Sequence, residues 1–266
     1  MECACRGSVD RTGDRDVIEY LLWLLMTLPM PLMAVLLLAE NFLVFALALW
    51  FGGLLMRRYR DRAVCEAAAP IEPLEVALAL TTVVINTAVT IVGLWLWRVG
   101  WVRFRPDVDL RIVKDLVALT LAMDFLMYWL HRVAHTPLIY RILHRTHHRY
   151  DHPRPLTLFV LHPFETVSFG LLWLLVIMVY QASWVGMSLY LVLNVAFGAV
   201  GHLGVEPFPR SWIRIPLVSL IATSTFHSEH HADAGHNFGF YTLIWDRLFG
   251  TLAPRYEADF IHGIGQ

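Results

Sequence analysis

The sequence has little charge and few cysteines, and both shortages limit what the protein can be. Only 16% of its 266 residues are charged, whereas soluble domains average about 25%, so the composition disfavours a water-soluble globule. The 21 lysine and arginine residues do not exceed the 22 aspartate and glutamate residues, which excludes the basic surface of a nucleic-acid-binding protein. The three cysteines, Cys3, Cys5 and Cys65, are too few for a disulfide framework, and no two form a C-x-x-C pair.

Two catalytic signatures are missing as well. No H-E-x-x-H motif occurs, so the sequence does not support the zinc site of metalloproteases. No G-x-G-x-x-G motif occurs either, so the chain carries no dinucleotide-binding fingerprint. Reducing equivalents for any redox reaction are therefore expected to come from elsewhere.

Long hydrophobic runs are what the sequence has in place of charge. Hydrophobic residues make up 57% of the chain. Runs with almost no charge extend over residues 20–39, 41–56, 76–97, 116–130 and 166–201. Because about 20 apolar residues cross a bilayer as a helix, the sequence predicts an all-α polytopic membrane helical bundle of about four to six spans, with a cytoplasmic helical cap. Pro29 and Pro31 are expected to kink the first span, and residues 181–183 are expected to turn the chain within the last run.

The chain is expected to have three parts: a polar N-terminal tail (1–16), membrane spans without site residues (17–114), and a membrane and cap region that carries the site (115–266). Arginines gather on the cytoplasmic side of membrane proteins, and four of them follow the second run directly, at positions 57, 58, 60 and 62. This pattern places the cap in the cytoplasm, although the arginines between residues 98 and 111 fall on the predicted outer side. Without an ER-retrieval tail or an N-glycosylation sequon, a bacterial inner membrane is favoured over the ER membrane of a eukaryote.

Histidine is abundant, and most of the 13 histidines fall into three clusters. The clusters are His131 and His135; His144, His147 and His148; and His227, His230 and His231. Spacings of three and four residues place side chains on one helix face, so each cluster is predicted to form one set of ligands. A single histidine is more often structural, but neighbouring imidazoles repel one another when protonated, and neutral imidazole is the commonest metal ligand. Because one tetrahedral zinc takes four ligands, eight histidines predict two metal ions.

The cluster order H-x-x-x-H, H-x-x-H-H, H-x-x-H-H on a membrane protein resembles the fatty acid hydroxylase/sterol desaturase superfamily of membrane di-iron oxidoreductases. Other matching pieces are His162-Pro-Phe-Glu165, Gly201-His202 and the segment 236–251. The resemblance covers about residues 115–251. It implies an O2-dependent di-iron monooxygenase that hydroxylates, or desaturates, an alkyl C–H bond of a lipid-like substrate such as a fatty acyl chain or a sterol-type lipid.

The resemblance also implies the cofactors, the partners and the ligands. Two iron ions (Fe2+/Fe3+) are the expected cofactors, and electrons from NAD(P)H are expected to arrive through a ferredoxin or cytochrome b5-type donor. The implied metal ligands are His131, His135, His144, His147, His148, His202, His227, His230 and His231. No catalytic residue beyond these ligands is expected.

Six further residues are expected to surround the ligands and hold them: Asp124, His162, Glu165, Asn194, Glu206 and His236. Asp124 precedes His131 by seven residues, two helical turns, and is expected to accept a hydrogen bond from a ligating imidazole. The alternative for Asp124 is a structural carboxylate paired with an arginine, and Asn194 suits a bond between helices equally well. Asp246 and Arg247 are expected to form an ion pair inside the cap.

Four arginines lie close to the histidine clusters, at Arg132, Arg141, Arg145 and Arg149. They suit the anionic or polar head group of a substrate, or else they are ordinary positive charge at the membrane surface.

Two other functions are open on the sequence. A metal-binding transport protein would be expected to carry ionisable residues at mid-bilayer depth in several spans, and these runs contain almost none. A zinc-dependent membrane hydrolase would be expected to carry a glutamate-bearing motif, which is missing.

Overall fold

The computed structural model describes residues 12–263, and its regular elements are helices and helical turns. Within this range the strand-like pairings are three isolated bridges, such as the one between Ala63 and Val205, so the predicted all-α fold is confirmed. Most of the predicted tail (1–16), with Cys3 and Cys5, lies outside the described residues. Its last five residues begin helix α1 (Thr12–Thr27).

The predicted boundary between the first two spans is wrong. The structure ends α1 at Thr27 and begins α2 (Met30–Arg58) three residues later, so residues 30–58 form one helix where two runs were expected. Pro29 and Pro31 start this helix rather than kink it, because proline has no backbone N–H and suits the first helical turn. Glu40, the charge that separates the two runs, sits inside α2, where its carboxylate accepts a hydrogen bond from the Asn41 side chain at 3.0 Å.

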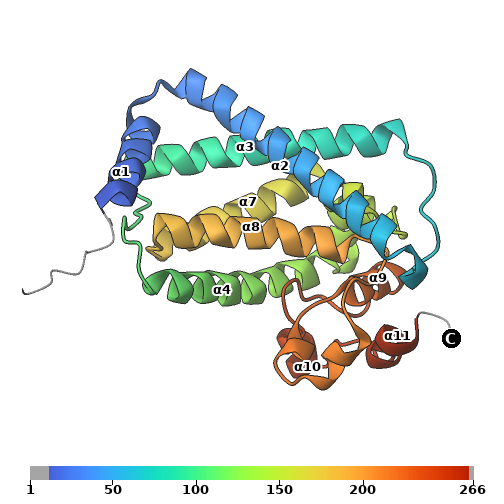
Figure 1. Cartoon of the computed structure of the whole chain (residues 1–266). Helices are drawn as coiled ribbons and strands as arrows, with labels where there is room; N and C mark the ends of the chain where they lie inside the picture. The colour runs from blue at the N-terminus through green and yellow to red at the C-terminus, as the bar shows by residue number, and fades with distance from the viewer. Residues whose placement is uncertain (1–11, 264–266) are drawn as a thin grey trace, which may run out of the picture.

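The remaining long helices follow the predicted runs. They are α3 (Pro73–Arg98), α4 (Arg111–Ala134), α7 (Pro163–Val179) and α8 (Trp184–Gly201). α2 packs on α3, α3 on α7 and α4 on α8, and Figure 1 shows these helices running alongside one another, with α2 crossing them obliquely. By length and composition, α2, α3 and α8 could each cross a membrane.

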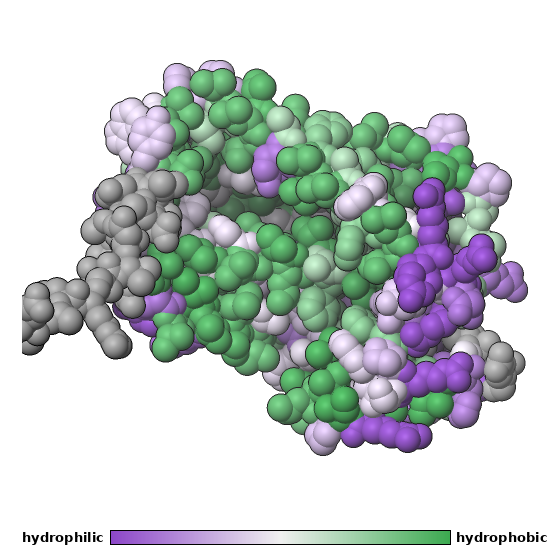
Figure 2. Space-filling model, viewed as in Figure 1, coloured by the Kyte–Doolittle hydropathy of each residue, from purple (hydrophilic) through white to green (hydrophobic). Residues whose placement is uncertain are grey.

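The outward faces of these helices are apolar. Trp95, Leu175 and Val192 are among many large hydrophobic side chains that are more than half exposed. Figure 2 shows hydrophobic residues over the middle of the molecule and hydrophilic residues gathered at the end that holds α9 and α11. An apolar belt with a polar end is the surface expected of a membrane protein.

Arginines at the opposite end hold helix ends together. Arg98 at the end of α3 donates to the Leu25 carbonyl oxygen at 2.9 Å. Arg105 pairs with the buried Asp115 at 2.8 Å, and the same carboxylate accepts from the Ser183 backbone N–H at 2.8 Å. Contacts within the protein therefore explain why Arg98 and Arg105 lie at this end, although it is the side of the membrane predicted to be outside.

The cap is built from short helices at the polar end of the bundle (Figure 1). Between α4 and α7 lie α5 (Pro137–Ile139), a π-helical turn (Tyr140–His144), α6 (Arg145–His148) and a 3-10 turn (Pro155–Phe159). After α8 come two 3-10 turns (Arg210–Arg214 and Val218–Leu220), α9 (Ser224–Ala232), α10 (Ile244–Phe249) and α11 (Tyr256–His262). Phe226, Leu243, Tyr256 and Phe260 form the buried apolar core of this second part.

Candidate metal centre

The structure brings all nine predicted ligands together in two groups. We call His131, His135, His144, His148 and His230 the first group, and His147, His202, His227 and His231 the second group. Within each group the ligand atoms lie within 4.8 Å of one another. No aspartate, glutamate or cysteine of the described residues belongs to either group.

Neighbouring histidines contribute to different groups. His147 belongs to the second group and His148 to the first, and His230 and His231 are divided in the same way. Successive residues of a helix point about 100° apart because a turn has 3.6 residues, so one H-x-x-H-H motif reaches two centres. The prediction that each sequence cluster forms one ligand set is therefore wrong. Each H-x-x-H-H segment lies between the two groups and joins them.

Oxygen acceptors fix the orientation of five imidazoles through the Nδ1 atom. The pairs are His131 with the Phe238 carbonyl (2.9 Å), His144 with the Glu165 carboxylate (2.5 Å), His147 with the Val160 carbonyl (3.1 Å), His202 with the Gly198 carbonyl (2.8 Å) and His230 with the His236 carbonyl (2.6 Å). An oxygen acceptor needs an N–H donor, so Nδ1 carries the proton in each of these rings. In the neutral imidazole the lone pair is then on Nε2.

The Nε2 atoms of each group converge on one another. In the first group, His131 and His144 approach to 3.1 Å, as do His148 and His230. In the second group, the separations are 3.0 Å for His227 and His202, 3.2 Å for His231 and His227, and 3.3 Å for His202 and His147.

These separations fit a shared cation. Two nitrogens, each about 2.1 Å from one ion and at roughly 90–110° to each other, are about 3.0–3.4 Å apart. Facing lone pairs, such as those of His131 and His144 or of His147 and His202, repel unless a positive charge lies between them. The donor set in each group therefore fits a metal ion bound by imidazole.

Burial keeps these imidazoles neutral. It lowers the pKa of His148 to about 3, with a further decrease from the nearby His131. It lowers the pKa of His202 to about 4. Both rings are therefore deprotonated at neutral pH, as a metal ligand must be.

Glu165 lies where the sequence analysis expected it, against a predicted ligand. It stands in the first turn of α7, and its Oε1 atom accepts from His144 Nδ1 at 2.5 Å. Its second oxygen is buried without a hydrogen-bond partner in the described structure. A carboxylate in this position fixes the imidazole ring and raises its basicity.

Asp124 does not contact a histidine. Its carboxylate accepts from the backbone N–H groups of Tyr241 (2.9 Å) and Thr242 (3.2 Å) and from the Trp245 indole N–H (3.1 Å). Two helical turns place Asp124 about 10.5 Å from His131 along the axis, which is too far for the predicted hydrogen bond. Asp124 instead holds the loop whose Phe238 carbonyl accepts from His131.

Asn194 and Glu206 also hold elements rather than ligands. The Asn194 side chain accepts from the Tyr241 hydroxyl at 2.6 Å, which ties α8 to the same loop. Glu206 accepts from the Thr225 backbone N–H at 3.0 Å and from the Thr225 hydroxyl at 2.7 Å. It therefore caps the start of α9, the helix that carries three predicted ligands.

The side chains of His162 and His236 lie outside both groups. His162 is the N-cap of α7, where its Nδ1 accepts from the Phe164 N–H at 3.3 Å. His236 Nδ1 bonds Asp233 at 2.9 Å, and only the backbone carbonyl of His236 reaches His230. Of these two residues, only His236 contacts a predicted ligand, and it does so through its backbone carbonyl.

Sequence reasoning missed the role of Asp246. No ion pair joins its carboxylate to Arg247, which instead approaches Glu257 at 3.4 Å. Asp246 accepts from the backbone N–H groups of Phe238 (2.8 Å) and Gly239 (2.7 Å). Gly239 leaves room for this carboxylate, because a Cβ atom there would lie 2.7 Å from Asp246 Oδ2, and this contact is evident only in the structure. The predicted Asp246–Arg247 pair is therefore wrong.

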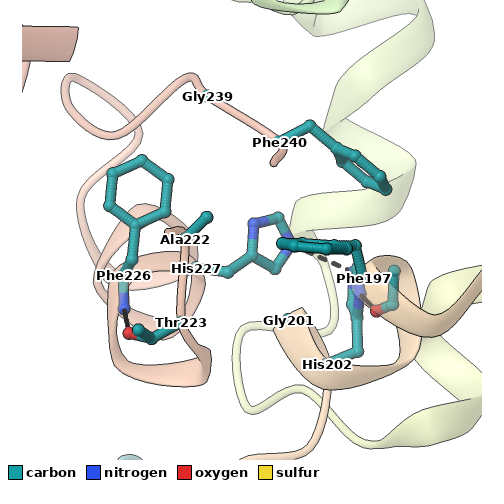
Figure 3. A pocket seen from close by; sticks show the side chains of 10 residues that line it. Phe197, Gly201, His202, Ala222, Thr223, Phe226, His227, Gly239 and Phe240 are labelled. Atoms are coloured by element: carbon teal, nitrogen blue, oxygen red, sulfur yellow. Dashed lines mark hydrogen bonds between the residues drawn. The ribbon is translucent and has the colours of Figure 1, made fainter. Parts of the chain in front are cut away.

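An apolar slot reaches the second group from the side of α8. Phe197, Phe226 and Phe240 line it, and the imidazoles of His202 and His227 point into it (Figure 3). Its volume is about 10 Å³, about enough for one water molecule. In this conformation the slot keeps bulk water away from the second group and is too small for a lipid.

Comparison with known proteins agrees with the geometry. The family model described as fatty acid hydroxylase matches residues 116–251. The chain is 31% identical over 160 residues to a cholesterol 25-hydroxylase-like protein of Danio rerio, which covers 59% of this chain and 63% of that protein. It is 32% identical over 136 residues to a very-long-chain aldehyde decarbonylase of Oryza sativa subsp. indica (48% of this chain, 21% of the relative).

A third relative is the lathosterol oxidase of Homo sapiens, 29% identical over 145 residues, which is 53% of this chain and 45% of that protein. The chain thus covers less than two thirds of the length of each of these relatives. No solved structure gives a significant match.

Proposed function

This chain belongs to the fatty acid hydroxylase family, and from that premise we propose that it is an O2-dependent di-iron membrane monooxygenase that oxidises an alkyl C–H bond of a lipid. The relatives whose names describe sterol oxidation, a cholesterol hydroxylase-like protein and a lathosterol oxidase, support lipid oxidation as the reaction class. Hydroxylation is the proposed outcome, and desaturation is its close variant on the same C–H bond.

The observation that carries the proposal is the convergence of nine imidazoles in two groups. The first group would hold one iron ion through His131, His135, His144, His148 and His230. The second group would hold the other through His147, His202, His227 and His231. When bound, the two ions would supply the redox equivalents by which O2 attacks an unactivated C–H bond.

The chain's own residues orient the ligands and exclude water. Glu165 and the Phe238 and Val160 carbonyls hold imidazole rings by their Nδ1 protons, so that Nε2 faces inward. The phenylalanines of the slot keep the second group dry, which protects a reactive centre from side reactions with water. The given sequence has no G-x-G-x-x-G dinucleotide-binding fingerprint, and a ferredoxin or cytochrome b5-type protein fed by NAD(P)H is the proposed electron donor.

The apolar belt and the arginine distribution support the proposed location. Arginines at positions 57–62, 132–154 and 210–214 belong to the same end of the molecule as the histidines, and positive charge favours the cytoplasmic side. The centre would therefore face the cytoplasm in a multi-pass membrane protein. We assign that membrane to the bacterial inner membrane, or to the ER in a eukaryotic host.

The test is lipid mass spectrometry on cells that produce the protein or its His230→Ala variant at matched levels in the membrane. The wild-type protein is expected to give lipids heavier by one oxygen atom, or lighter by two hydrogen atoms, that the variant does not give. Identical lipid profiles with an efficient electron donor present would contradict the proposal.

A further inference from the structure

A second cavity reaches the first histidine group from the polar end of the bundle. It has a volume of about 580 Å³ and lies between the start of α3 and the segment 140–150, with His148 in its wall. Small-molecule sites have volumes of about 300–1,000 Å³. Of the two cavities described, this one has room for more than a water molecule.

The walls of this cavity are of two kinds. Leu74 and Leu78 of α3 form an aliphatic wall, and Leu74 is 47% exposed. Arg141, Arg145 and Arg149, spaced four residues apart, line the other side. Although residues 17–114 contain none of the predicted ligands, they thus supply the side of the cavity that an alkyl chain would contact.

The charge on the arginine side is not balanced within the described structure. Arg141 and Arg145 are exposed, and their guanidinium groups form no ion pair or hydrogen bond with another described residue. The one acidic partner of Arg149 among the described residues is Glu72, at 2.9 Å. The next arginine along the chain, Arg154, differs, because the buried Glu75 holds its guanidinium at 2.8 Å.

Two further residues in or near the cavity are Tyr150 and Arg132. The hydroxyl oxygen of Tyr150, another lining residue, is buried without a partner in the described structure. Arg132, the fourth arginine singled out in the sequence, does not line the cavity. It donates to the Tyr128 hydroxyl at 3.2 Å and lies over the Trp129 ring. Arg132 has no acidic partner among the described residues either, so what sets the cavity apart is that three guanidinium groups and an unpartnered hydroxyl gather opposite an aliphatic wall.

We propose that this cavity binds the anionic head group, a carboxylate or a phosphate, of an amphiphilic substrate whose alkyl chain contacts Leu74 and Leu78. The proposal rests on the proposed function, because it places that substrate beside His148. Guanidinium groups suit planar carboxylates and phosphates, and the aliphatic wall suits the chain that follows the head group. The sterols and aldehydes in the names of the relatives are uncharged, so an anionic substrate would distinguish this chain from them.

The experiment measures equilibrium binding to the full-length, metal-loaded protein in nanodiscs of uncharged lipid. The probes are a long-chain fatty acid, a lysophosphatidic acid of equal chain length, and the matching fatty alcohol as the uncharged control. The variants are Arg141→Gln, Arg145→Gln and their combination, with Arg214→Gln as a matched control, because Arg214 is exposed at the same end but does not line the cavity. Binding is read without turnover, so failure of this inference is distinct from failure of the proposed reaction.

The wild-type protein is expected to bind at least one of the two anions more tightly than the alcohol. Each single variant should weaken that binding about tenfold, near the lower end of the range for a hydrogen bond to a charged group, and the double variant should weaken it further. Fatty acid and lysophosphatidic acid separate the carboxylate from the phosphate. Equal affinity for anions and alcohol, or no effect of the double variant, would overturn the proposal. Unchanged binding of the anions, with turnover lost only when a protein electron donor replaces a chemical reductant, would make the arginines a donor-docking surface and would also overturn it.

Discussion

Single residues decide to which of the two groups each histidine belongs. His147 and His148 are adjacent in sequence, yet they lie in different groups. We predict that His147→Ala and His148→Ala each abolish turnover and lower the bound metal, and that each variant perturbs a different one of the two ions. The reason is that each removes one imidazole from only one group. Metal analysis combined with spectroscopy of each ion measures both effects.

The exposed His262, near the C-terminal end of the described residues, provides the control for this prediction. His262→Ala should retain metal and activity. Full activity in either His147→Ala or His148→Ala would remove the two-metal interpretation, and identical spectroscopic changes in both variants would remove the division into two groups.

Glu165 lies against a single predicted ligand. It contacts His144 and none of the other predicted ligands at hydrogen-bond distance. Because carboxylates behind a ligating histidine contribute about 10–100-fold to metal affinity or activity, we predict a loss of that size for Glu165→Ala. Glu165→Gln retains an acceptor oxygen and should lose less. Metal titration and kcat of the two variants test the prediction, and equal, wild-type behaviour of both would return Glu165 to a purely structural role.

At the scale of elements, the loop between α9 and α10 joins the bundle to the metal centre. Asp124 of α4 and Asp246 of α10 both accept hydrogen bonds from its backbone, and its Phe238 carbonyl holds His131. A buried carboxylate that satisfies several donors stabilises a loop, because each donor left without a partner costs roughly 1–3 kcal/mol.

Replacing Asp124 should therefore affect stability first and the metal second. We predict that Asp124→Ala lowers the free energy of unfolding by about 2–4 kcal/mol and weakens the metal bound through His131. Asp124→Asn, which keeps one acceptor oxygen, should lie between this variant and the wild type. Thermal unfolding with and without metal separates the two effects. An unchanged melting temperature in Asp124→Ala would contradict the role of the carboxylate in holding the loop.

The elements also show what the sequence can and cannot predict. Apolar runs located α3, α4, α7 and α8 because helix length and hydropathy are local properties. The boundary between α1 and α2 was missed because a proline starts a helix as readily as it kinks one, and one charge at Glu40 does not end one.

The candidate site likewise has features that the local sequence predicts and features that depend on the fold. The nine predicted ligands came from spacing and family resemblance, and the structure brings these side chains together. Their division into two groups depends on side-chain directions in three separate segments, and the partners of Asp124 depend on a loop more than 110 residues away, so neither follows from local pattern.

For the whole molecule, the arrangement predicts an orientation in the membrane. Ser211 and Arg103 are exposed residues at opposite ends, the first in the cap and the second between α3 and α4. In a variant whose native cysteines are replaced by serine, we predict that Arg103→Cys reacts with a membrane-impermeant maleimide added to cells with a permeable outer membrane. Ser211→Cys should react only after the inner membrane is opened. The reverse pattern of labelling would place the histidines outside the cytoplasm.

We propose that the two histidine groups hold two iron ions. The most direct measurement is the metal content and Mössbauer spectrum of the protein purified without added metal from cells grown on isotopically enriched iron. We expect about two iron ions per chain with mainly nitrogen ligands, because a group of converging imidazoles suits one such ion, and we expect their loss in a variant that lacks His147 and His148. Freshly prepared, active protein that contains stoichiometric zinc and no iron would contradict it.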